Sequence, residues 1–117
     1  MAVRMKRAYE APAADDGYRV LIDRLWPRGR RKEDLRLDAW LKDLAPSREL
    51  RTWYGHDPAR WPEFRARYGR ELSGTSAQEA LHDLARRAER GIVTLVFGAK
   101  DAEHSNAAAL KAIIERM

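Results

Sequence analysis

The chain has 117 residues, of which 35% are charged, with a formal net charge of +5 and no cysteine. This length fits one domain with a single core. The absence of cysteine excludes disulfides, thiolate nucleophiles and cysteine-ligated metal sites. No apolar run reaches the length of a membrane span, and the first seven residues lack the apolar core of a signal peptide. We therefore expect one cytoplasmic domain over residues 1–117, whose positive charge favours anionic partners, nucleic acid included.

The first part of the chain predicts two strands and a basic turn. Val3–Tyr9 alternates loosely between apolar and charged residues and predicts a first strand. Tyr18–Leu25 is largely apolar and β-branched, which is typical of a strand covered on both faces. Pro27 cannot donate a hydrogen bond to a neighbouring strand, so the strand should end before it. Residues 28–32 then place four cations around one glycine.

The middle of the chain predicts a run of helices. Apolar residues at helical spacing from Leu35 to Leu44 predict one helix, ended by Ala45-Pro46. Ser47 can cap a short helix that closes at Gly55. Asp57-Pro58 is a clear helix start, because an acidic cap is followed by proline at the first helical position.

The last part predicts a helix, a buried strand and a final helix. Ser76–Glu79 is typical of a capping box, and Gly91 is expected to end that helix in the left-handed conformation. Ile92–Phe97 predicts a second buried strand, and the final helix should begin within Asp101–Asn106. We expect an α/β domain with a largely parallel sheet flanked by helices, in which Tyr18–Leu25 and Ile92–Phe97 are parallel neighbours.

Charged and polar side chains follow both buried strands. The carboxyl ends of parallel strands meet at one edge of a sheet, where such folds bind ligands. Asp23 and His104 are the candidate catalytic residues, because a carboxylate and an imidazole can transfer protons. Adjacent strand residues face opposite ways, so Asp23 should pair with Lys100 or His104 and not with Arg24. The candidate ligand-binding residues are Arg24, Arg28, Lys100, Asp101 and Asn106. Together they predict a site for a small anion, phosphorylated compounds included.

Each of these residues also has a structural interpretation. Asp23 and Arg24 can fix the end of a strand through ion pairs, and the basic turn can be a solvated loop. There is no glycine-rich phosphate-binding signature to identify a cofactor. His56 has the position of a structural loop residue, and no ligand spacing supports a metal site formed by His56, His104 and Asp23. The four tryptophans fit core positions better than base-stacking ones.

The residues leave three functions open. The first is a ligand-binding or catalytic domain for a small anionic compound at the shared strand edge. The second is a nucleic-acid-binding module that uses the basic turn and the arginine face of the helix after Asp57. The third is an accessory protein whose cleft binds a protein partner.

The residues around the predicted site also resemble a known family. The motifs are Asp16-Gly-Tyr-Arg-Val-Leu-Ile-Asp-Arg-Leu-Trp-Pro-Arg-Gly29, Leu44-Ala-Pro-Ser47 and Trp53-Tyr-Gly-His-Asp-Pro58, followed by Trp61–Tyr68, Val93–Phe97 and Lys100-Asp-Ala-Glu-His-Ser-Asn106. They resemble the YeaO-like family, catalogued as domain of unknown function 488, which has no agreed activity. The resemblance implies a small bacterial cytoplasmic α/β protein and marks the same two strand ends. Relatives outside this branch often carry cysteines beside the last strand and beside the following histidine, whereas this chain has none, so a thiol mechanism does not carry over.

Overall fold

The structure is a computed structural model that describes all 117 residues. Four strands form one sheet in the order β1-β4-β2-β3, and every neighbouring pair is parallel. The strands are β1 Ala2–Arg7, β2 Tyr18–Leu21, β3 Ala39–Trp40 and β4 Ile92–Phe97. The helices are α1 Lys32–Leu35, α2 Arg48–Tyr54, α3 Trp61–Glu71, α4 Thr75–Arg90 and α5 Asn106–Glu115. The predicted α/β fold is confirmed, including the parallel pairing of β2 with β4.

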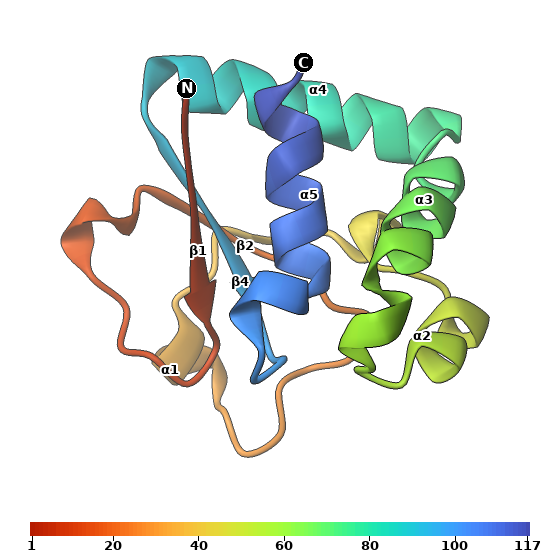
Figure 1. The fold of residues 1–117 in the computed structure, drawn as a ribbon. Helices are drawn as coiled ribbons and strands as arrows, with labels where there is room; N and C mark the ends of the chain where they lie inside the picture. The colour runs from red at the N-terminus through yellow and green to blue at the C-terminus, as the bar shows by residue number, and fades with distance from the viewer.

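The two faces of the sheet are covered differently. Helices α4 and α5 pack against one face, and α3 joins them at the side (Figure 1). That face contributes Val20 and Leu95 to a core of 21 buried residues. The opposite face contributes Leu21 and Val96 to a small core of four buried residues, which Leu35 at the end of α1 completes. The alternation along β2 and β4 follows from strand geometry, because successive side chains point to opposite faces.

The predicted helix over Leu35–Leu44 is wrong. The segment instead contains the end of α1, the short strand β3 and a 3₁₀ turn. The strand covers the open edge of β2, where the Leu41 amide donates to the Leu21 carbonyl at 2.9 Å. The apolar residues of the segment divide between the two cores, since Leu35 lies in the small one and Leu44 in the large one. A single helix with one apolar face could not serve both.

Strand β2 is shorter than predicted and ends at Leu21. One further bond, from the Ile22 amide to the Val96 carbonyl at 3.1 Å, continues the pairing. Side chains then replace strand partners: Trp40 Nε1 donates to the Asp23 carbonyl at 2.7 Å, and Asn106 Nδ2 donates to the Ile22 carbonyl at 3.3 Å. The chain therefore leaves the sheet as soon as it reaches the charged residues.

The helix caps were predicted with mixed success. Ser47 Oγ accepts from the Leu50 amide at 3.1 Å, and Asp57 Oδ1 accepts from the Ala59 amide at 3.0 Å, as predicted. The capping box at Ser76–Glu79 is wrong, because α4 begins at Thr75 and has no side-chain cap. Gly91 ends α4 in an extended conformation, with φ −173°, and not in the left-handed one. No helix of the structure is both long and apolar enough to cross a membrane.

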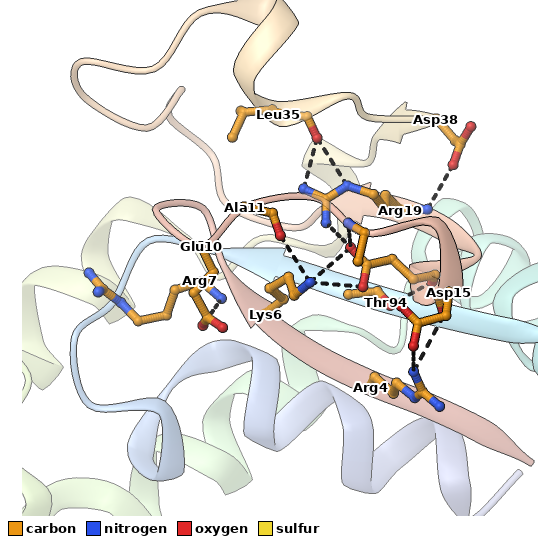
Figure 2. Close-up of polar contacts among 12 residues, drawn as sticks. Arg4, Lys6, Arg7, Glu10, Ala11, Asp15, Arg19, Leu35, Asp38 and Thr94 are labelled. Carbon is orange, nitrogen blue, oxygen red and sulfur yellow. Dashed lines mark hydrogen bonds and ion pairs between the residues drawn. The ribbon is translucent and has the colours of Figure 1, made fainter.

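A buried ion cluster lies beside the smaller core (Figure 2). Asp16 and Arg19 are each only 4% exposed and pair at 2.7 Å. Lys6 Nζ also donates to Asp16 at 2.9 Å, and Arg19 donates two hydrogen bonds to the Leu35 carbonyl, at 3.0 and 2.8 Å. Thr94 Oγ1 donates to the Asp16 carbonyl at 2.6 Å. Burial acts to raise the pKa of Asp16, but hydrogen bonds from the Ala13 amide, Lys6 and Arg19 outweigh it and lower the pKa.

Candidate anion-binding cleft

A cleft with a volume of about 840 Å³ opens at the carboxyl ends of β2 and β4, between α2 and the first turn of α5. The carboxyl ends of these strands form the lower edge of the sheet in Figure 1. Six of the predicted site residues line it: Asp23, Arg24, Lys100, Asp101, His104 and Asn106. Arg28 is not among the lining residues. It is exposed in the basic turn, where its carbonyl accepts a hydrogen bond of 3.0 Å from the Tyr9 hydroxyl. The structure therefore brings six of the seven together and leaves Arg28 outside.

Asp23 joins the ends of three elements. Its Oδ2 accepts from the Gly98 amide after β4, and its Oδ1 accepts from Asn106 Nδ2 at the start of α5, both at 2.9 Å. A Cβ at Gly98 would lie 3.2 Å from Asp23 Oδ2, so the glycine lets the carboxylate approach closely. Burial raises the pKa of Asp23, and the two hydrogen bonds and the nearby charges of Arg51 and His56 offset this only in part. The expected pairing with Lys100 or His104 is not made.

The segment after β4 is held from both sides. Arg7 Nε donates to the Ala99 carbonyl at 2.9 Å, which fixes the backbone that leaves the strand. His104 Nδ1 lies 2.7 Å from Asp101 Oδ2, and this hydrogen bond holds the pKa of Asp101 below its ordinary value. The ring of His104 meets Trp61 edge-on, with the ring centroids 5.5 Å apart, and the Tyr54 hydroxyl donates to the His104 carbonyl at 2.7 Å. Four contacts therefore fix this side of the cleft.

Helix α2 contributes a wall that the sequence did not predict. Arg48 and Arg51 line the cleft, as does His56 in the turn that follows α2. The sequence placed neither arginine in the site, although it predicted that Trp53 and Tyr54 of this helix could line the cleft, and it treated His56 as structural. Arg48 and Arg51 are three residues apart and so lie on one side of the helix. This spacing is the sequence signal that could have identified them as a pair. Their closeness to Asp23 depends on how α2 packs against α3, and no local pattern encodes it.

The cleft holds cations that have no partner. Arg24, Arg48, Arg51 and Lys100 all line it, and none of them forms an ion pair. The carboxylates of Asp23 and Asp101, by contrast, already accept hydrogen bonds. No three histidine or acidic side chains of the chain lie together as metal ligands would. The arrangement concentrates positive charge and free hydrogen-bond donors in one concave place.

The profile of the DUF488-N3i family, described as the inactive DUF488-N3 subclade, matches residues 2–117. The chain belongs to this family. It is 38% identical to the uncharacterized protein YeaO of Escherichia coli K12, over 94% of each chain. It is 46% identical to the uncharacterized protein Rv3073c of Mycobacterium tuberculosis H37Rv, over 96% of this chain and 92% of that protein. No solved structure matches it significantly. The resemblance to the YeaO-like family is thus confirmed.

Five of the six motifs that carry the DUF488 resemblance contribute residues to the cleft of this DUF488-N3i protein. Asp16–Gly29 provides Asp23 and Arg24, and Lys100–Asn106 provides the segment with His104. Trp53–Pro58 provides Tyr54 and His56, Leu44–Ser47 provides Pro46, and Trp61–Tyr68 provides Phe64. The resemblance therefore covers a site whose parts lie far apart in the sequence.

Proposed function

We propose that the cleft binds a small anion, with a phosphate or a carboxylate as its charged group. The observation that carries this proposal is the set of four unpaired cations, which come from three separate segments of the chain. Asn106, the first residue of α5, also lines the cleft, so the partial positive charge of a helix N-terminus faces the same space. We place this binding in the cytoplasm, as expected for a chain without cysteine.

We favour binding over chemical conversion of the ligand. The family is described as an inactive subclade. Both carboxylate oxygens of Asp23 accept hydrogen bonds from the protein itself. We therefore assign Asp23 the role of a positioning residue, which holds the strand ends and α5 at the distance that forms the cleft.

One contact favours proton transfer as a second candidate function. Asp101 can hold the His104 ring in one tautomer through their 2.7 Å contact, which leaves Nε2 free to accept a proton from a ligand. If His104 is catalytic, His104→Gln should keep ligand affinity and lower turnover by about 100-fold or more. A variant that loses affinity or thermal stability instead would give His104 a binding or structural role.

The nucleic-acid alternative has weaker support. On α3, Arg67 pairs with Glu63, and Arg60, just before the helix, pairs with Asp57 at 3.8 Å. Both arginines also stack on the Trp53 ring. Arg60 and Arg67 of the arginine face after Asp57 are thus already engaged within the chain, unlike the cations of the cleft. Phosphate-backbone contacts would make oligonucleotide binding fall steeply with salt, so titrations at two salt concentrations test this alternative.

The test of anion binding compares one cleft arginine with one distant arginine. Phosphate, pyrophosphate, acetate and citrate are titrated into the wild type, Arg51→Ala and Arg90→Ala by calorimetry. Arg90 ends α4 at the opposite end of β4 and is exposed. We expect Arg51→Ala to weaken the best anion by about 10-fold or more, since a charge-assisted hydrogen bond contributes roughly 1.5–3 kcal/mol. Arg90→Ala should bind like the wild type. Equal losses in both variants, or no binding by any anion, would contradict the proposal.

A further inference from the structure

One wall of the cleft carries a large apolar side chain that faces solvent. Leu25 lines the cleft and is 62% exposed, which exceeds the 50% of Met1 at the chain end. Its neighbour Trp26 is held in place, because Trp26 Nε1 donates to the Arg30 carbonyl at 2.6 Å and its ring packs edge-on against Trp40 at 5.4 Å. Leu25 is therefore presented by a fixed turn, and nothing in the chain covers it.

The cleft also contacts apolar groups on the α2 side. Tyr54 and Phe64 both line it, and their rings stack with centroids 4.2 Å apart. They are only 5% and 2% exposed, so little more than their edges reaches the cleft. Pro46 adds a further apolar contact. The cleft therefore combines several unpaired cations with a few apolar contacts in one space.

The volume of the cleft exceeds that of an inorganic anion several times over. It measures about 840 Å³, whereas one water molecule occupies about 30 Å³ in the liquid. Sites for organic ligands span roughly 300–1,000 Å³. A bound phosphate or carboxylate would reach some of the cations, but it would leave Leu25 uncovered.

We infer that the ligand of the cleft is an organic anion with a ring or a comparable apolar part, which packs on Leu25 while its charged group meets Arg51 and Lys100. The inference rests on the proposed anion binding and specifies the class of anion. Leu25 then acts as a specificity residue. An organic anion that covers Leu25 removes apolar surface from water, whereas inorganic phosphate does not, so the site would bind the organic anion more tightly.

The experiment uses pairs of compounds that share a charged group. Methyl phosphate and phenyl phosphate form one pair, and acetate and phenylacetate form a second pair for a site that prefers carboxylates. Each compound is titrated by calorimetry into the wild type, Leu25→Ser and Met117→Ser. Met117 is an apolar residue with 40% exposure at the chain end away from the cleft, so its variant is the matched control (Figure 1).

We expect the ring-bearing member of one pair to bind the wild type and Met117→Ser at least about 10-fold tighter than its methyl partner. Leu25→Ser should reduce this preference to about threefold or less while its affinity for the methyl compound stays unchanged. Leu25 is too exposed for the variant to disturb the core. Equal affinity for both members would overturn this inference and leave anion binding intact. A ring preference that survives in Leu25→Ser would also overturn it, and binding of none of the four compounds would contradict the proposed function as well.

Discussion

Two aspartates flank β2, and they differ in the kind of partner that each one has. Asp16 lies just before the strand, where the Ala13 amide and the cations Lys6 and Arg19 lower the pKa of its carboxyl. Asp23 lies just after the strand and contacts only the neutral donors of Gly98 and Asn106, and its pKa is raised. The cations near Asp23 point into a cleft and stay unpaired. One region is a closed structural cluster, and the other is an open site.

This difference shows how to interpret arginines in a strongly basic chain. Lysine and arginine together number 23, so charge alone marks no site. In the Asp16 cluster each charged group contacts a partner of opposite charge, and no buried side-chain nitrogen or oxygen in the structure lacks a hydrogen-bond partner. Around Asp23 the cations lack partners although a carboxylate is near. We infer that unpaired cations gathered in one cleft, more than the number of charges, mark a binding site, since Arg28 and Arg90 are also unpaired but lie outside the cleft.

The largest effect that we expect is a loss of stability when Arg19 is removed from the buried ion cluster around Asp16. Arg19→Met keeps an apolar stem of similar length but leaves the Leu35 carbonyl without its donor and the Asp16 carboxylate with Lys6 as its one remaining cation. Removing one partner of a buried ion pair costs roughly 3–5 kcal/mol of unfolding free energy. Urea unfolding followed by circular dichroism measures the loss. Arg51→Ala is the control, and it should change stability by less than about 0.5 kcal/mol because Arg51 is exposed and unpaired. Similar losses in the two variants would erase the distinction between the regions.

A smaller effect tests the boundary of the open site. Arg24 lines the cleft and Arg28, four residues later, does not. Arg24→Ala should weaken binding of the best anion by about 1.5–3 kcal/mol, whereas Arg28→Ala should leave it unchanged. Calorimetric titration of both variants gives the comparison directly. A loss in Arg28→Ala that matches the loss in Arg24→Ala would extend the site onto the basic turn and favour a larger polyanionic partner.

The sequence predicted those parts of the fold whose signals are local. The uninterrupted apolar residues of Ile92–Phe97 identified β4, and the caps of Ser47 and Asp57 lie within three residues of the amides that they accept from. Strand β3 was missed for two reasons. Its two residues form a strand only because they pair with the edge of β2, and the leucines around them are spaced as in a helix. A two-residue segment is too short to show the alternation of residues that predicts a strand, so its pairing with a distant strand cannot be predicted from the sequence.

The candidate site was predicted to the same extent. Residues after β2 and β4 were found because parallel strands end at a common edge, which topology requires. Arg51 and His56 were missed because their place depends on the packing of α2 against α3. Arg28 was included because it follows the same strand, but the turn that begins at Asp23 carries it out of the cleft.

The smallest effect that we expect is a difference in pH dependence between the two aspartates. The pKa of Asp16 is lowered on folding, so its charged form adds stability at neutral pH, and that contribution is lost as pH falls through the folded pKa. The pKa of Asp23 is raised, so its contribution is greatest in acid and declines as pH rises through the folded pKa. The stability deficit of Asp16→Asn should therefore shrink between pH 7 and pH 3, while the deficit of Asp23→Asn should grow. Urea unfolding of both variants and the wild type across this range measures the two slopes. Slopes of the same sign would mean that the two carboxylates share one electrostatic environment, and the contrast between a closed cluster and an open site would fail.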